Sequence, residues 1–170
     1  MIIRPVTKDD LEWLREQRNR PEINFYFNQY DFISKEEQNE WYEKDVLTKK
    51  FYAFIIEDTS FKKIGYVGLK TLNWILRSAE FSIFVIPEEQ KKGYGKEALR
   101  EILRFGFENL NFHRIYSTVF DFNKAIEVYK KVGFEVEGML RDTCFKKGRY
   151  WNSYYISMLE DEYKKLYHSK

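Results

Sequence analysis

The feature that most constrains the fold is an apolar strand followed, after a short polar loop, by an amphipathic helix. From Phe81 onward the predicted strand of residues 77–86 is apolar at both odd and even positions, which indicates burial on both faces, and Pro87 ends it. Residues 93–109 then place apolar side chains three and four positions apart, which predicts a helix with one buried face. Together these segments predict a sheet on which helices pack.

The remaining patterns extend this sheet and its helices along the chain. Further strands are predicted at residues 2–6, 51–57, 64–73, 114–120, 134–141 and 150–159. Further helices are predicted at residues 7–18, after Ser34, at 123–132 and at 160–167, with a short helical or irregular piece opening at Pro21. Because hairpins mix with crossovers, we expect an α/β (α+β) fold with a mixed, largely antiparallel, twisted central sheet and helices on both faces. The length and the lack of a linker predict one domain over residues 1–170.

Composition argues against several classes of function. Lys plus Arg total 29 and Asp plus Glu total 27, and this near-balance argues against the basic stripe of a nucleic-acid binder, so we expect no such partner. Cys144 is the single cysteine and the two histidines lie far apart, so we expect no metal site and a buried or idle thiol. No apolar run reaches about 18 residues and the charged N-terminus does not resemble a signal peptide, so we expect no membrane contact and a cytoplasmic location.

The loop between the apolar strand and the amphipathic helix has the features of an anion site. At a helix start, unpaired backbone N–H groups and the helix dipole favour a negative charge. Gly93 and Gly95 let a phosphate approach the backbone, and Lys91, Lys92 and Lys96 add positive charge. The alternative is a plain helix start with solvated lysines. The loop lacks the Gly-Lys-Ser/Thr of a Walker loop and the third glycine of a dinucleotide fingerprint, so neither of those sites is predicted.

The run Gln90-x-x-Gly93-x-Gly95 resembles the Gln/Arg-x-x-Gly-x-Gly/Ala signature of the GNAT superfamily of N-acetyltransferases. The resemblance covers nearly the whole chain and is strongest to the branch of ribosomal-protein N-terminal, spermidine and amino-sugar nucleotide acetyltransferases. The residues that match this branch are 77–81, 123–134, 137–141 and 148–150. The resemblance implies the GNAT fold and direct transfer of the acetyl group of acetyl-CoA, the co-substrate, to a primary amine. A module that binds CoA without chemistry is the alternative from another class.

The resemblance also implies a set of residues for acetyl-CoA. The strand before the loop splays from its neighbour in this family, and the pantetheine arm pairs with its backbone, as an added strand would. The implied contacts are Ile83, Phe84 and Val85 for the arm, Gln90, Lys91, Lys92, Gly93, Tyr94, Gly95 and Lys96 for the pyrophosphate, and Asn123 and Lys131 nearby. The alternative for the strand is an ordinary buried strand.

Two residues are implied to be catalytic. Tyr129 stands where the family often has a tyrosine that protonates the CoA thiolate, and a phenol with a pKa of about 10 suits a thiol with a pKa of about 8.5. Its alternative is a core or rim aromatic. Glu80 is the candidate base that takes a proton from the ammonium form of the acceptor. Its alternative is a salt-bridge partner of Arg77 or a hydrogen-bond anchor.

The acceptor pocket of this branch is implied to involve residues 18–30, where Tyr26, Phe27, Asn28 and Tyr30 are the candidate substrate contacts. These aromatic residues could stack on a substrate or form a hydrophobic wall. Polyamine acetyltransferases tend to carry paired acidic residues where this chain has Asn28-Gln29, which weighs against spermidine. Residues 18–23 also resemble amino-sugar nucleotide acetyltransferases, and a protein N-terminus is a third acceptor class. A homodimer is a further expectation, based on exposed aromatic residues.

Overall fold

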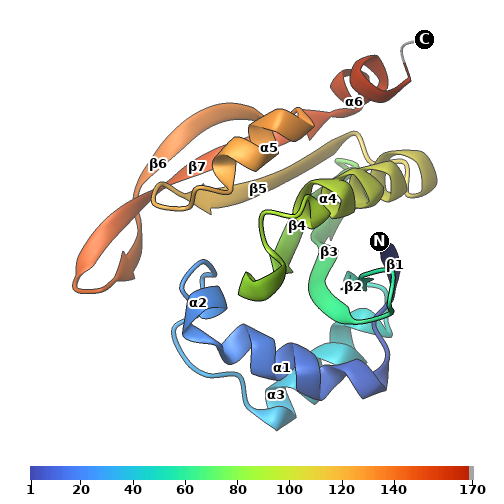
Figure 1. Cartoon of the computed structure of the whole chain (residues 1–170). Coiled ribbons are helices and arrows are strands. Elements are labelled where there is room, and N and C mark those ends of the chain that lie inside the picture. The colour runs from blue at the N-terminus through green and yellow to red at the C-terminus, as the bar shows by residue number, and fades with distance from the viewer. Residues whose placement is uncertain (169–170) are drawn as a thin grey trace.

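The computed structural model describes residues 1–168, which form one seven-stranded sheet (Figure 1). The strands, in their order across the sheet, are β1 (Ile2–Pro5), β2 (Tyr52–Glu57), β3 (Lys63–Asn73), β4 (Ser78–Val85), β5 (Arg114–Phe120), β7 (Arg149–Leu159) and β6 (Glu135–Lys146). Every neighbouring pair is antiparallel except β4 and β5, which are parallel. The predicted mixed, largely antiparallel sheet is therefore confirmed.

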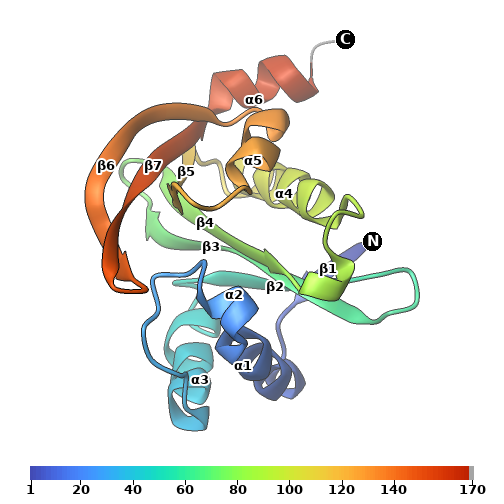
Figure 2. The ribbon, with the colours of Figure 1, turned by 60° about the vertical axis from the view of Figure 1, so that its left-hand side comes forward.

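Helices cover both faces of this sheet (Figure 2). One face carries α1 (Leu11–Asn19), α2 (Pro21–Asn24) and α3 (Lys35–Trp41), and the other carries α4 (Tyr94–Arg104), α5 (Ile126–Val132) and α6 (Glu160–Tyr167). The two-residue period of the strands sorts the core into two layers, so Phe81 of β4 packs with α4 and α5 while Phe84 packs with α1. This confirms the predicted burial of β4 on both faces. In the described part of the chain, no helix combines the length and apolarity needed to cross a bilayer.

The strands β4 and β5 part after a short contact. Their pairing is confined to Ser78–Arg114, Ala79–Ile115 and Glu80–Tyr116. Beyond this point β4 continues along β3 to Val85, whereas β5 continues along β7 to Phe120. Among residues 1–168, the edge of β4 that faces β5 has no strand partner from Phe81 to Val85. Figure 1 shows the two ribbons diverging, which leaves backbone donors and acceptors of β4 open to a ligand.

Strand β6 and helices α5 and α4 differ from the sequence prediction at their ends for identifiable reasons. Strand β6 runs to Lys146 rather than to residue 141, because register shifts near Gly138 and Cys144 break the two-residue pattern. Helix α5 begins at Ile126 rather than at Asn123, because the Asn123 side chain accepts a hydrogen bond from the backbone of Ala125 and forms a turn. Helix α4 gives way to a π-helical turn at Phe105–Asn109.

Candidate functional site

The start of α4 forms a nest of free backbone donors. Gly93 precedes the helix with φ of 93°, a left-handed conformation that glycine adopts without a Cβ penalty. The first hydrogen bond of the helix runs from Glu97 N to Gly93 O, at 3.1 Å. No backbone N–H of residues 91–96 has a hydrogen-bond partner within the described chain. Six adjacent free donors at the positive end of a helix dipole fit a diphosphate.

The side chains of this loop divide into groups that fasten it and groups that remain available. Gln90 Nε2 donates to Val85 O at 2.9 Å and ties the loop to the end of β4. Lys92 Nζ lies 2.7 Å from a carboxylate oxygen of Glu89, which also pairs with Lys62 at 2.9 Å. These two lysines hold the pKa of Glu89 below its usual range. Lys92 is therefore already engaged by a carboxylate, whereas no ion pair holds Lys91 elsewhere in residues 1–168.

The other residues implied to bind acetyl-CoA lie on β4, at the start of α4, and in or just before α5. Ile83, Phe84 and Val85 lie on the unpaired stretch of β4, and a Cβ on Gly95 would lie 3.8 Å from Val85 Cγ2. The loop and the strand edge are thus adjacent. The remaining members are Tyr94, partly buried against the core; Lys96, in the first turn of α4; Asn123, in the turn before α5; and Lys131, on the exposed side of α5.

Tyr129 lies in α5 with its side chain packed under the sheet. The residue is 9% exposed, and its ring makes edge contacts with Phe81 and Phe134 at centroid distances of 5.3 and 6.3 Å. Burial raises the pKa of the Tyr129 phenol well above its ordinary value, so it remains protonated at physiological pH. No residue between 1 and 168 forms a hydrogen bond with its hydroxyl. The hydroxyl is a proton donor without a protein acceptor.

Glu80 is the last residue of β4 that pairs with β5, so it lies at the point where the two strands part. Its carboxylate accepts a hydrogen bond from Thr71 Oγ1 at 3.1 Å and lies 3.2 Å from Lys70 Nζ. Arg77 instead pairs with Glu160 at 3.0 Å, so the alternative interpretation of an Arg77–Glu80 salt bridge is wrong. Because side chains alternate along a strand, Glu80 lies on the face of α1–α3, opposite the face on which Tyr129 packs. The two candidate catalytic residues therefore approach each other only where the sheet opens.

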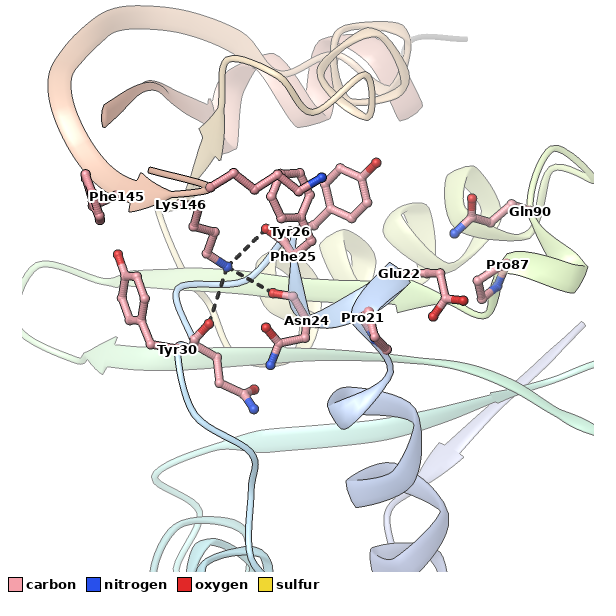
Figure 3. A pocket seen from close by; sticks show the side chains of 12 residues that line it. Pro21, Glu22, Asn24, Phe25, Tyr26, Tyr30, Pro87, Gln90, Phe145 and Lys146 are labelled. Carbon is pink, nitrogen blue, oxygen red and sulfur yellow. Dashed lines mark hydrogen bonds between the residues drawn. The ribbon is translucent and has the colours of Figure 1, made fainter. Parts of the chain in front are cut away.

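A cavity of about 740 Å³ opens between the segment that follows α1, the β6–β7 hairpin and the loop before α4 (Figure 3). Its walls consist of Pro21, Glu22, Asn24, Phe25, Tyr26, Gln29, Tyr30, Pro87, Gln90, Phe145, Lys146 and Lys147. Tyr26 and Tyr30 line this cavity. Phe27 packs against Phe84 at a centroid distance of 6.3 Å beneath the Arg18 guanidinium, in the manner of a hydrophobic wall, and Asn28 is exposed. Gln90 joins this cavity to the α4 nest.

The sequence does not predict that the β6–β7 hairpin forms part of this cavity. Lys146 is buried and Lys147 lies over the ring of Phe25, 4.5 Å from its centroid. The sequence marks both lysines only as part of a hairpin turn, and no periodicity indicates that the hairpin folds against residues 24–30. Cys144 is 1% exposed, with its sulfur 3.9 Å from the hydroxyl of Tyr30, which confirms a buried thiol. The described residues offer no cluster of ligands for a metal ion.

Comparison with known proteins agrees with this geometry. The family model described as an acetyltransferase (GNAT) domain matches residues 1–135. The spermidine N(1)-acetyltransferase of Vibrio cholerae is 33% identical over 164 residues, which cover 96% of this chain and 95% of that protein. The Escherichia coli K12 spermidine N(1)-acetyltransferase is 31% identical over 162 residues, covering 95% and 87%. The crystal structure of the Vibrio cholerae spermidine N-acetyltransferase in complex with CoA and spermine superposes with a TM-score of 0.91 at 33% identity, covering 95% of this chain and 96% of that one. The chain belongs to the GNAT family of acetyltransferases, with acetyl-CoA as its acetyl donor.

Proposed function

We propose that this protein transfers the acetyl group of acetyl-CoA directly to the primary amine of a small molecule bound in the cavity beside α2. The observation that carries this proposal is the nest of six free N–H groups at the start of α4, next to the unpaired edge of β4. The nest suits the pyrophosphate, and the strand edge suits the amides of the pantetheine arm. Gln90 lies between this donor site and the cavity, which supports one continuous site for both substrates.

The reaction that this arrangement supports is a direct displacement. Glu80 takes a proton from the acceptor ammonium, directly or through a water molecule. The amine nitrogen then attacks the thioester carbon and forms the C–N bond, and a backbone N–H near Val85 stabilises the oxyanion of the tetrahedral intermediate. The C–S bond breaks, and the CoA thiolate takes the phenolic proton of Tyr129. The ammonium loses two protons in becoming the amide: the first passes to Glu80 and then to water, and the second, lost from the nitrogen of the tetrahedral intermediate, balances the proton that Tyr129 gives to the sulfur.

The raised pKa of Tyr129 affects how well it can act as the general acid. A buried phenol is a weaker acid than a phenol in water, so proton transfer to a solvated thiolate with a conjugate-acid pKa of about 8.5 becomes less favourable. A thiolate released into the same dry space suffers the same loss of solvation, which raises its proton affinity as well. Tyr129 therefore suits this acid role only if the sulfur reaches the buried side of the gap between β4 and β5.

Polyamines are the first acceptor class to test, because two full-length relatives are spermidine acetyltransferases and a similar structure holds spermine. An amine with less positive charge, such as an amino-sugar nucleotide, is the second candidate. The cavity supports it because two lysines, Lys146 and Lys147, line its wall, whereas Glu22 is the one carboxylate among its lining residues. A polycation would meet few carboxylates there.

An acceptor panel tests this proposal. The release of CoA thiol is measured with acetyl-CoA and spermidine, a monoamine, an amino-sugar nucleotide or a short peptide with a free N-terminus. The proposal requires an amine-dependent rate with at least one small molecule, and kcat/KM ranks the two acceptor classes. A chain that binds acetyl-CoA in calorimetry but releases no thiol with any of these amines is a CoA-binding module, and the enzymatic proposal fails.

The assembly of the protein is a separate proposal. We expect residues 1–170 to act as one domain and two copies to form a homodimer. The outer edge of β6 supports a dimer, since this twelve-residue strand exposes Val136, Met139 and Leu140. Sedimentation velocity at micromolar concentration measures the state, and a purely monomeric boundary would contradict it. A cytoplasmic location and the absence of a nucleic-acid partner stay predictions.

A further inference from the structure

The β6–β7 hairpin inserts an ammonium group into the segment that follows α2. Lys146 Nζ lies within hydrogen-bond distance of four backbone carbonyl oxygens, those of Asn24 at 3.1 Å, Phe25 at 3.1 Å, Phe27 at 2.5 Å and Gln29 at 3.3 Å, which share its three N–H donors. Figure 3 shows the Lys146 side chain reaching the backbone beside Asn24 and Phe25. These contacts join positions more than 115 residues apart in the sequence. The side chain thus bridges two separate walls of the acceptor cavity.

The surroundings of this ammonium are unusual for a buried charge. Lys146 is 9% exposed, and none of the carboxylates of residues 1–168 forms an ion pair with it. Burial lowers the pKa of Lys146, as expected for an ammonium withdrawn from water. The four carbonyl dipoles replace the missing counter-ion, and the rings of Phe25, Tyr30 and Phe120 lie 5.6 to 5.8 Å away.

The carbonyl oxygens in turn depend on the ammonium of Lys146 for a hydrogen-bond donor. Within the described chain, the oxygens of Phe25, Phe27 and Gln29 accept no backbone N–H. They converge on one point, where their partial negative charges repel one another unless a cation lies between them. Removing the ammonium would leave these acceptors unsatisfied or force the segment to open.

We propose that Lys146 is a positioning residue of the acceptor pocket, which fixes residues 24–30 against the β6–β7 hairpin. This segment supplies Tyr26, Gln29 and Tyr30 to the cavity wall, while the hairpin supplies Phe145 and Lys147. Lys146 acts through these groups by holding their backbone. The inference rests on the proposed function for the identity of the cavity as the acceptor pocket, whereas the contacts themselves do not depend on that identity.

Lys146→Met tests the proposal, since methionine keeps an unbranched apolar stem and removes the donors. We expect the KM for the acceptor found in the panel to rise at least about tenfold, because several charge-assisted hydrogen bonds that order its pocket are lost. The KM for acetyl-CoA should stay within about twofold, because the loop that forms the α4 nest is held separately, by the hydrogen bond from Gln90 to Val85 O. Lys63→Met is the matched control: it breaks a 2.7 Å ion pair with buried Asp10 and should lower stability without changing the acceptor KM.

Hydrogen–deuterium exchange of the unliganded protein provides a readout independent of turnover. We expect amides of residues 24–33 to exchange faster in Lys146→Met, while those of α4 keep their wild-type rates. A folded variant with unchanged exchange in this segment overturns the proposal, as does faster exchange with an unchanged acceptor KM. If the wild type acetylates no amine, the proposed function fails, and exchange alone then decides whether Lys146 orders the segment. If Lys146→Met does not fold, Lys146→Gln, which keeps two N–H donors on a shorter stem, replaces it in both measurements.

Discussion

Replacing Tyr129 by phenylalanine removes one oxygen and leaves the buried ring in contact with Phe81 and Phe134. The hydroxyl has no hydrogen-bond partner in the described chain, so its loss should change the free energy of unfolding by less than about 1 kcal/mol. A positioned general acid contributes roughly 10²- to 10⁴-fold to the rate, which corresponds to about 3–5 kcal/mol of the activation free energy. The expected rise in the activation free energy is therefore several times larger than the expected fall in the free energy of unfolding.

The assay for Tyr129→Phe combines three measurements. Thiol release gives kcat, calorimetry gives the acetyl-CoA Kd, and thermal unfolding gives Tm, which should fall by no more than about 4 °C. We expect kcat to fall at least about 100-fold while the Kd changes little. In the wild type, the raised pKa of Tyr129 places any alkaline loss of the acid above pH ~10. Equal turnover by the variant and the wild type would remove Tyr129 from the mechanism and leave it as a core aromatic.

Three further substitutions test separate parts of the structure. Gly93→Ala places a Cβ on a residue with φ of 93°, so it should lower the free energy of unfolding by about 1–2 kcal/mol and weaken acetyl-CoA binding in calorimetry. Gly148→Ala, at φ of 75° in the hairpin turn, is the control and should show a similar loss of stability without the loss of binding. Glu80→Gln should lower kcat/KM by about 100-fold at neutral pH and recover as rising pH deprotonates the amine; a pH-independent ratio to the wild type would indicate a structural anchor. Burial alone would raise the pKa of Asp10, but hydrogen bonds from Arg4, Lys63 and Thr7 outweigh it and hold that pKa below its usual range. The stability that Asp10 contributes is present above its unfolded pKa of about 3.9 and is lost as pH falls through the lower folded value. In denaturant titrations, Asp10→Asn should therefore lower the free energy of unfolding by about 3 kcal/mol at pH 7 and reduce the loss of stability at acid pH.

The sheet and most of its helices follow from local patterns in the sequence. The apolar runs of β2 and β3, the burial of β4 on both faces and the apolar stripe of α4 all have the length or the period of the element that forms. The prediction failed at β6, where bulges near Gly138 and Cys144 shift the register and leave most of the strand exposed. A pattern of alternate burial cannot extend through residues 135–143, none of which is buried.

Some parts of the candidate site could be predicted from the sequence and others could not. The α4 nest was predictable because its parts are local: two glycines, a helix start and the preceding strand. The wall formed by Lys146 was not, because its acceptors are backbone carbonyls, which any residue supplies. The true partner of Glu80 was missed for a related reason. Lys70 faces it from the neighbouring strand through the β3–β4 register, which the sequence pattern does not specify at single-residue precision.

A two-substrate initial-rate measurement tests the central claim most directly. CoA thiol release is recorded over a grid of acetyl-CoA and acceptor concentrations, with the amine that ranks first in the panel. Direct transfer at one continuous site requires both substrates to be bound together, so double-reciprocal plots should intersect. Parallel lines would indicate a ping-pong reaction through a covalent acetyl-enzyme and would contradict direct attack by the amine. CoA thiol release that does not depend on the amine would contradict it as well.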